Sequence, residues 1–144
     1  MIHGQCLCGG VQFDIDRVHG PFELCHCNRC RKTSGTAFMA AVGVLSKKFH
    51  WICGKELVKS YEAPLLKIPP AYRVTFCSNC GSPVPDPHST ASWFEIPAGL
   101  LDGEFSMQPD KHIYVDCKSD WFKISDSLPQ LSEIQLIKHR NNLK

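Results

Sequence analysis

The sequence lacks any long apolar run, any strong excess of charge and any repeated or low-complexity segment. No stretch of about 18 apolar residues occurs, which argues against a membrane-spanning helix. The first residues, 1–5, lead directly into cysteines and contain no apolar stretch long enough for a signal peptide, so we expect a cytoplasmic protein. A length of 144 residues, with 43% hydrophobic residues, predicts one folded domain over residues 1–144.

The formal charge of +2 gives no case for a nucleic-acid partner. This charge counts every thiol as neutral. If seven cysteines ionise to hold two Zn²⁺ ions, the charge falls by about three units and the protein becomes slightly acidic. Because a nucleic-acid-binding domain needs a clearly basic surface, we predict no nucleic-acid partner.

Cysteine, in contrast, is abundant. The chain has nine cysteines, an odd number, and no visible export signal, which together argue against a disulfide framework and favour metal binding or thiol chemistry. Seven of them fall into three clusters: Cys6 with Cys8, Cys25 with Cys27 and Cys30, and Cys77 with Cys80. Cys53 and Cys117 lie outside the clusters and receive no role, although a weaker hypothesis makes one of them an additional ligand.

The spacing of the clusters suits zinc. A Cys-x₂-Cys turn lets two sulfurs reach one ion, and Gly81 supplies the positive φ that closes such a turn, while a Cys-x-Cys pair on an extended chain points both sulfurs to one face. Structural zinc takes four ligands and catalytic zinc takes three, so seven cysteines predict one site of each kind. Spacing alone leaves the partition open, since Cys77 and Cys80 can pair with either Cys6/Cys8 or Cys27/Cys30. An iron–sulfur centre ranks behind zinc.

Short alternating runs predict a mainly β fold with short helices. The expected strands span residues 11–16, 38–44, 57–61, 72–76, 93–96, 112–115 and 121–124. The expected helices are one turn at 29–34 and a terminal helix at 131–141, within a C-terminal tail of residues 131–144. Residues 134–136 fit a strand equally well.

The three cysteine clusters closely resemble those of the family of glutathione-dependent formaldehyde-activating enzymes, which also includes centromere protein V. The matching stretches are residues 4–9, 25–32, 73–82, 98–102, 109–115 and 126–129, with Trp121, so the likeness runs from about residue 4 to 130. The resemblance implies a single zinc-bound domain with a β-tent fold. It also implies a closed site of Cys6, Cys8, Cys77 and Cys80 and an open, catalytic site of Cys25, Cys27 and Cys30.

The activity implied by the resemblance is that of a zinc-dependent carbon–sulfur lyase-type enzyme. Its reaction would add the thiol of glutathione, or of another small thiol, to an aldehyde such as formaldehyde, giving S-hydroxymethylglutathione. Three basic residues beside the cysteine motifs could receive the carboxylates of a peptide-like thiol, or could be exposed or stabilise the thiolates. They are Arg31, Lys32 and Arg73.

Two histidines and two other functions complete the predictions. His26 lies between two ligand cysteines, but on an extended chain its side chain should face away and serve packing or hydrogen bonding. His112 fits an ordinary strand position. The alternative functions are a zinc-stabilised binding module without catalytic activity, for a protein or chromatin partner, and a metal or redox sensor.

Overall fold

The chain divides into two compact units in a computed structural model that describes residues 1–67, 69–86 and 91–143. The first unit combines residues 1–19 with 43–105, and the second combines residues 20–42 with 106–144. The predicted mainly β fold with short helices is confirmed. No helix in the described ranges is long and apolar enough to cross a membrane. The single domain over residues 1–144 remains a prediction.

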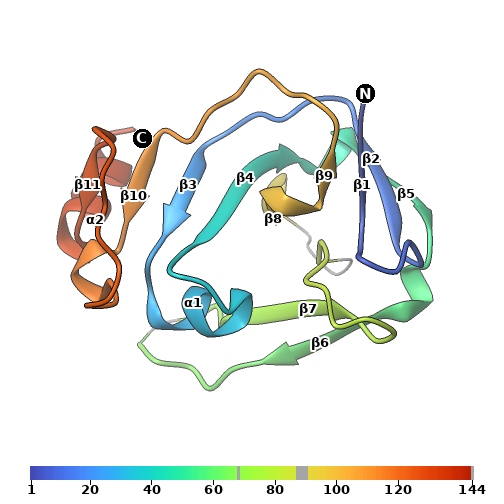
Figure 1. Cartoon of the computed structure of the whole chain (residues 1–144), viewed down its shortest axis with the longest axis horizontal. Coiled ribbons are helices and arrows are strands. Elements are labelled where there is room, and N and C mark those ends of the chain that lie inside the picture. Colours follow the sequence, from blue (N-terminus) through green and yellow to red (C-terminus); the bar gives the residue numbers. More distant parts are fainter. Residues whose placement is uncertain (68, 87–90, 144) are drawn as a thin grey trace. The chain divides into compact units, whose positions relative to one another are not determined.

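The first unit contains an antiparallel sheet of order β5-β2-β1-β9 (Figure 1). Its strands are β1 (Ile2–Gln5), β2 (Gln12–Ile15), β5 (Phe49–Cys53) and β9 (Leu101–Asp102). The alternation in β2 buries Phe13 and Ile15 completely, as a one-sided strand requires. The ring of Phe13 packs on Phe49 and Trp51 of β5, with ring centroids 5.2 and 6.3 Å apart, so aromatic contacts build this core.

A two-stranded antiparallel ladder in the same unit leads to one cysteine turn. The ladder pairs β6 (Val58–Glu62) with β7 (Arg73–Cys77), and its register sets Val58 opposite Cys77. Cys77 therefore ends a strand and begins a turn. The unit also contains β8 (Trp93–Pro97) and three 3₁₀ helices: η1 (Ser46–Lys48), η2 (Lys55–Leu57) and η3 (Ala98–Leu100).

The second unit is built on a sheet of order β11-β10-β3-β4. Its strands are β3 (Phe22–Cys25), β4 (Met39–Leu45), β10 (Lys111–Ile113) and β11 (Gln130–Leu131). Strand β10 runs parallel to both β3 and β11, whereas β3 and β4 are antiparallel. β3 is buried throughout, and its Glu23 is paired with Lys111 at 3.4 Å and Arg140 at 2.9 Å. β4 continues into the first unit at Gly43, and β8 is hydrogen-bonded to β4.

Two α-helices in the described part of the chain belong to the second unit. Helix α1 (Asn28–Ser34) begins after Cys27 and ends at Gly35, whose φ of 68° allows its N–H to reach Arg31 O at 2.9 Å. Helix α2 (Glu133–Asn141) begins with a capping box formed by Ser132 and Gln135. Both expected helices form, but α2 starts later than predicted because β11 occupies residues 130–131.

The strand predicted at residues 121–124 is wrong. These residues form a turn and irregular backbone, in which the Lys118 ammonium donates to Phe122 O at 2.6 Å. The strand predicted at 112–115 also ends early, because Tyr114 adopts a left-handed conformation with φ 56° and starts η4 (Val115–Cys117). Strands β1, β3, β5, β9 and β11 were not predicted.

Candidate metal centres

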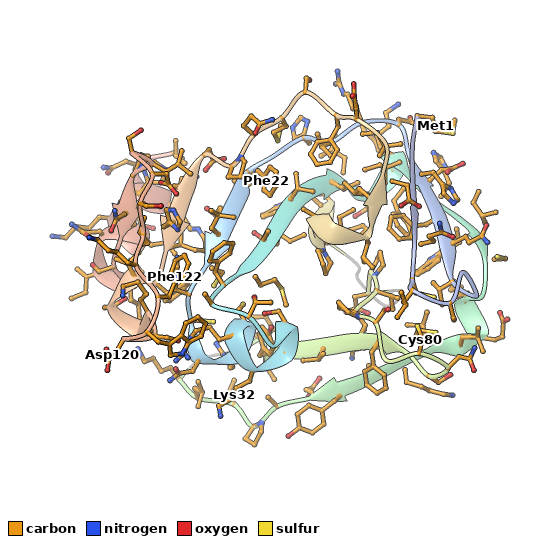
Figure 2. The ribbon with its side chains drawn as sticks, in the orientation of Figure 1. Met1, Phe22, Lys32, Cys80, Asp120 and Phe122 are labelled. Atoms are coloured by element: carbon orange, nitrogen blue, oxygen red, sulfur yellow. The ribbon has the colours of Figure 1, made fainter. Side chains whose placement is uncertain are left out.

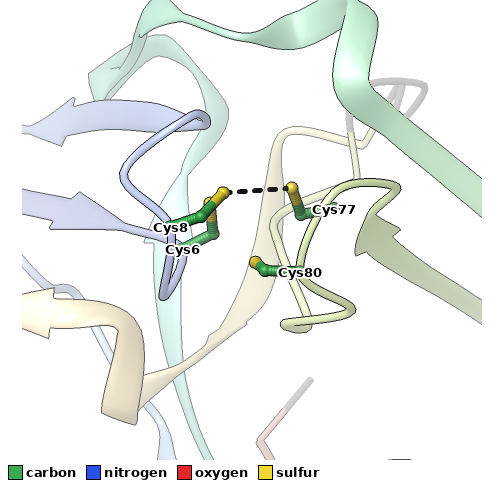
Figure 3. A group of neighbouring side chains, drawn as sticks. All are labelled: Cys6, Cys8, Cys77 and Cys80. Atoms are coloured by element: carbon green, nitrogen blue, oxygen red, sulfur yellow. Dashed lines mark hydrogen bonds between the residues drawn. The ribbon is translucent and has the colours of Figure 1, made fainter.

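Four cysteines of the first unit converge on one point, and Figure 3 shows their sulfurs turned toward one another. They are Cys6, Cys8, Cys77 and Cys80, whose Sγ atoms all lie within 4.8 Å of one another. Cys8 Sγ lies 3.5 Å from Cys6 Sγ and 3.9 Å from Cys77 Sγ. Four thiolate sulfurs this close could hold a borderline-soft cation such as Zn²⁺.

Tight turns bring each pair of these sulfurs together. The first pair lies in the turn after β1, closed by a hydrogen bond of 2.9 Å from Gly9 N to Cys6 O, so this chain is not extended as predicted. The second pair flanks a turn closed by a bond of 2.8 Å from Gly81 N to Cys77 O. Gly81 has φ 75°, as the sequence predicts for a residue that must close a Cys-x₂-Cys turn.

Burial and hydrogen bonding divide the negative charge unevenly among these four thiols. Burial raises the pKa of Cys6 to about 11. Hydrogen bonds from Ser82 lower the pKa of Cys80 to about 5, and the backbone N–H of Gly10 lowers that of Cys8. Because neighbouring thiolates repel one another, all four ionise together only around a cation, and the cluster therefore fits a divalent metal ion.

Three cysteines of the second unit form the other cluster, again with Sγ atoms within 4.8 Å of one another. Cys25 ends β3, Cys27 caps α1 and Cys30 lies in the first turn of that helix. Cys27 Sγ accepts a hydrogen bond of 3.4 Å from Cys30 N. Within residues 1–67, 69–86 and 91–143, no fourth His, Cys, Asp or Glu joins this group.

The sulfurs of this second cluster share charge in the same way. Hydrogen bonds from the thiols of Cys25 and Cys30 lower the pKa of Cys27. The thiols of Cys27 and Cys30, followed by burial, raise the pKa of Cys25. One thiolate therefore forms readily, while ionisation of all three requires a nearby positive charge, which again fits a metal ion. The structure brings together the residues of both predicted sites, and their roles remain predictions.

His26, the residue between Cys25 and Cys27, belongs to a buried hydrogen-bonded chain rather than to the cluster. His26 Nε2 lies 2.8 Å from His112 Nδ1, and His112 Nε2 lies 3.0 Å from Asp126 Oδ2. The His26 ring is fully buried, and its centroid lies 5.9 Å from that of Phe122. Phe122 is labelled in Figure 2. Burial, then the neighbouring His112, lowers the pKa of His26 to about 4, so this side chain is neutral near pH 7.

Arg31, predicted to bind a substrate carboxylate, is engaged within the protein. Its Nε donates to His26 O at 3.2 Å, and its Nη1 donates to Ser119 Oγ at 2.7 Å. Its Nη2 donates to Asn28 Oδ1. The guanidinium therefore ties α1 to the segment after η4, and binding of a carboxylate would use its remaining N–H groups.

The other two basic residues predicted to bind a carboxylate have different surroundings. Lys32 is exposed on α1, and its side chain makes no ion pair or hydrogen bond within the described part of the chain. Arg73 belongs to the first unit, where it pairs with Asp86 at 3.2 Å and with Glu62 at 3.9 Å. The carboxylate-binding roles of Lys32 and Arg73 remain predictions.

Cys53 and Cys117 belong to neither group of sulfurs. Cys53 is exposed on β5, whereas Cys117 is half-buried in η4, where burial, followed by nearby negative charge that includes Cys27, raises its pKa. Sequence reasoning missed Tyr114, whose pKa is raised by burial, with a further contribution from the charge of Cys25. Tyr114 lies only two residues after His112 in the sequence, and this proximity was the signal that could have drawn attention to it.

The fold and these clusters define a mainly β protein with two cysteine centres that could hold metal ions. Residues 1–117 match the family described as "Glutathione-dependent formaldehyde-activating enzyme". The chain belongs to this family. A relative from Halomonas elongata is 30% identical over 131 residues, which cover 86% of this chain and 81% of the relative. That relative is named, provisionally, as a glutathione-dependent formaldehyde-activating enzyme.

A solved structure is also similar. The crystal structure of a Rhodobacter sphaeroides protein matches with a TM-score of 0.51 and 20% identity, over 72% of this chain and 91% of that chain. At this identity the likeness supports the fold alone. The activity named for the family is glutathione-dependent formaldehyde activation.

Proposed function

We propose that this chain is a zinc-dependent carbon–sulfur lyase-type enzyme, cytoplasmic, that acts on glutathione or another small thiol and an aldehyde such as formaldehyde. The observation that carries the proposal is the three-sulfur cluster of Cys25, Cys27 and Cys30, which no fourth protein ligand completes within the described residues. A metal held by three protein ligands keeps a position for a reactant, as catalytic zinc does. The description of the family supports the choice of glutathione and formaldehyde.

The three cysteines of this cluster would act as anionic ligands. When bound there, Zn²⁺ would supply the positive charge that favours the deprotonated form of a substrate thiol. Because three cysteinates outweigh the charge of the ion, strong polarisation of a carbonyl is the weaker option, and activation of the sulfur is the better one. That sulfur would then add to the carbonyl carbon of the aldehyde, and the carbonyl oxygen would take up the proton that the thiol lost. In the reverse direction the C–S bond would break and the proton would return to the sulfur.

The residues around the cluster would keep it in place and receive the rest of the substrate. The bond from His26 N to Ile113 O, at 2.9 Å, and the buried contact from His26 to His112 fix the segment between Cys25 and Cys27, which joins β3 to α1. Lys32 is our preferred partner for a carboxylate of the thiol, because it lies on the helix of Cys30 and is unpaired within the described chain.

The test is exchange between formaldehyde and glutathione, followed by NMR on zinc-loaded protein. Since the two compounds also react without a catalyst, only acceleration above the uncatalysed rate counts. We expect acceleration by the wild type, its loss in Cys27→Ser with the fold retained, and its persistence in Cys53→Ser, which changes a cysteine outside both clusters.

Two results would contradict the proposal. If the wild type with both centres loaded gives no acceleration, the chain does not catalyse this reaction, and the zinc-stabilised binding module becomes the better hypothesis. If Cys27→Ser accelerates exchange as well as the wild type, the chemistry does not take place at the three-cysteine cluster.

A further inference from the structure

The four-cysteine centre differs from a purely structural zinc site in its exposure. Cys6 and Cys77 are 1% and 0% exposed, and Cys80 is half-buried, but Cys8 is an exposed residue. Leu7, which precedes it in the turn, is 88% exposed. The surface of the protein therefore passes directly over one of the four candidate ligands, while the opposite side of the centre packs into the core.

The sulfurs also differ in the hydrogen bonds that they receive. A buried backbone N–H, that of Val11, lies 3.3 Å from Cys6 Sγ. The side-chain amide of Asn79 lies 3.5 Å from Cys8 Sγ, and this contact is exposed. Cys8 also receives the backbone N–H of Gly10. Because Cys8 is exposed whereas Cys6 and Cys77 are buried, Cys8 is the member of the centre that an incoming molecule can reach.

An open cleft of about 710 Å³ lies against this exposed sulfur. Such a volume is enough for a small organic molecule. The cleft is lined by Cys8, by apolar groups that include Leu7, Pro83 and Leu100, and by the polar pair of Gln5 and Asp102. Gln5 Nε2 donates to Asp102 Oδ2 at 2.8 Å. The described residues that line the cleft include the carboxylate of Asp102 but no Lys, Arg or His that would attract an anion. The lining therefore suits a small neutral molecule better than an anion.

We propose that Cys8 is a nucleophilic thiolate of the four-cysteine centre, open to small, neutral carbon electrophiles that enter this cleft. In the reaction, the Cys8 sulfur attacks the electrophilic carbon with a lone pair, an S–C bond forms, and the leaving group departs with the bonding electrons. The step uses no oxidant, reductant or proton donor. It converts an anionic ligand into a neutral thioether.

This modification weakens the metal centre. A thioether has no negative charge to offer a divalent cation, so the remaining three sulfurs hold the ion less tightly. Since the centre joins two segments 69 residues apart, its loss also loosens the first unit. The four-cysteine centre is thus an electrophile-sensitive element, and this inference is independent of the proposed enzyme activity at the other cluster.

The experiment treats zinc-loaded protein with limiting iodoacetamide and follows each cysteine by peptide mass spectrometry, with released zinc measured by a colorimetric chelator. We expect Cys8 to be labelled roughly tenfold or more faster than Cys6 and Cys77, because the rate follows thiolate access. Labelling of Cys8 should release zinc in proportion. Cys53, exposed and outside both clusters, reports the rate of an ordinary thiol in the same sample.

A second variant tests the cleft without touching a ligand. Gly99 lines the cleft, and a Cβ added there meets no atom within 4 Å, so Gly99→Trp partly fills the cleft at little cost to the fold. We expect this variant to slow labelling of Cys8 relative to Cys53 at unchanged zinc content. Ser60→Trp, on exposed β6, is the matched control and should leave the rate unchanged.

Three results would overturn the proposal. The first is labelling of Cys53 while Cys8 stays unmodified in the zinc-loaded protein. The second is labelling of Cys8 that releases no zinc. The third is an unchanged Cys8 rate in Gly99→Trp, which would show that electrophiles do not approach through this cleft.

Discussion

The substitution His112→Phe tests whether the buried histidine chain stabilises the three-cysteine unit. The carboxylate of Asp126 only accepts hydrogen bonds, so His112 donates to it from Nε2. The other ring nitrogen of His112, Nδ1, is hydrogen-bonded to His26 Nε2 at 2.8 Å. Phenylalanine keeps an aromatic ring of similar size at position 112 but can neither donate nor accept, so the buried Nε2 of His26 loses its partner.

The magnitude follows from burial. His26 is 0% exposed, and leaving a buried polar atom such as its Nε2 without a hydrogen-bond partner costs about 1–3 kcal/mol. For a chain of 144 residues, each kcal/mol lowers the melting temperature by about 2–4 °C. The side chain of Asp126 is 47% exposed, so Asp126→Asn, which removes only the charge at the outer end of this hydrogen-bonded chain, should cost clearly less stability than His112→Phe.

The assay is urea unfolding of zinc-loaded wild type, His112→Phe and Asp126→Asn at the same pH, with zinc content measured in each sample. The expected order of stability is wild type, then Asp126→Asn, then His112→Phe. A His112→Phe variant as stable as the wild type would refute the reasoning, because His26 would then not depend on His112. Equal losses in both variants would refute the graded effect of burial.

Two further predictions concern pH and helix capping. The pKa of His26 is about 4 in the folded chain against an ordinary 6.5, so the unfolded chain binds the proton first as the pH falls. The free energy of unfolding should therefore fall by at most about 3 kcal/mol as the pH drops from 6.5 toward 4. His26→Phe should show a shallower fall when wild type and variant are unfolded by urea at each pH. Ser132 Oγ accepts a hydrogen bond from Gln135 N at 3.3 Å, so Ser132→Ala should lower the stability measured by thermal unfolding by about 1 kcal/mol. Aspartate is also a good helix cap, so Ser132→Asp should keep most of the stability of the wild type. Equal stability of Ser132→Ala and wild type would contradict a capping role.

Local sequence signals predicted the turn from Cys77 to Cys80 well because its determinants lie within a few residues. Gly81 is an example, since a positive φ after a Cys-x₂-Cys turn depends only on that turn. The strand at 72–76 was also close to the observed β7, Arg73–Cys77, because its β-branched and aromatic residues fit a half-buried ladder. The observed bounds differ by one residue at each end.

Long-range pairings explain what the sequence did not reveal. His112 lies in strand β10, as the sequence predicted. Its hydrogen-bond partner His26 is 86 residues away, and no local pattern near either residue indicates this bond. The alternation at residues 121–124 predicted a strand, yet Phe122 packs on the ring of His26 instead of joining a ladder. Glutamate is usually exposed, but Glu23 in β3 is buried. Its carboxylate forms ion pairs with Lys111 and Arg140, which lie far away in the sequence.

The two cysteine clusters differ in how much chain each one ties together, and this difference bears on their roles. Cys8 and Cys77 are 69 residues apart, whereas Cys25, Cys27 and Cys30 fall within a single turn region. Joining distant segments restricts the unfolded chain by about 2 kcal/mol more than joining neighbours of about 5 residues. A metal at the four-cysteine centre would therefore contribute strongly to folding of the first unit, even though Cys8 leaves that centre open to electrophiles. A metal held by three nearby cysteines would contribute much less to folding, so chemistry at its remaining position is the better reason for that cluster to exist.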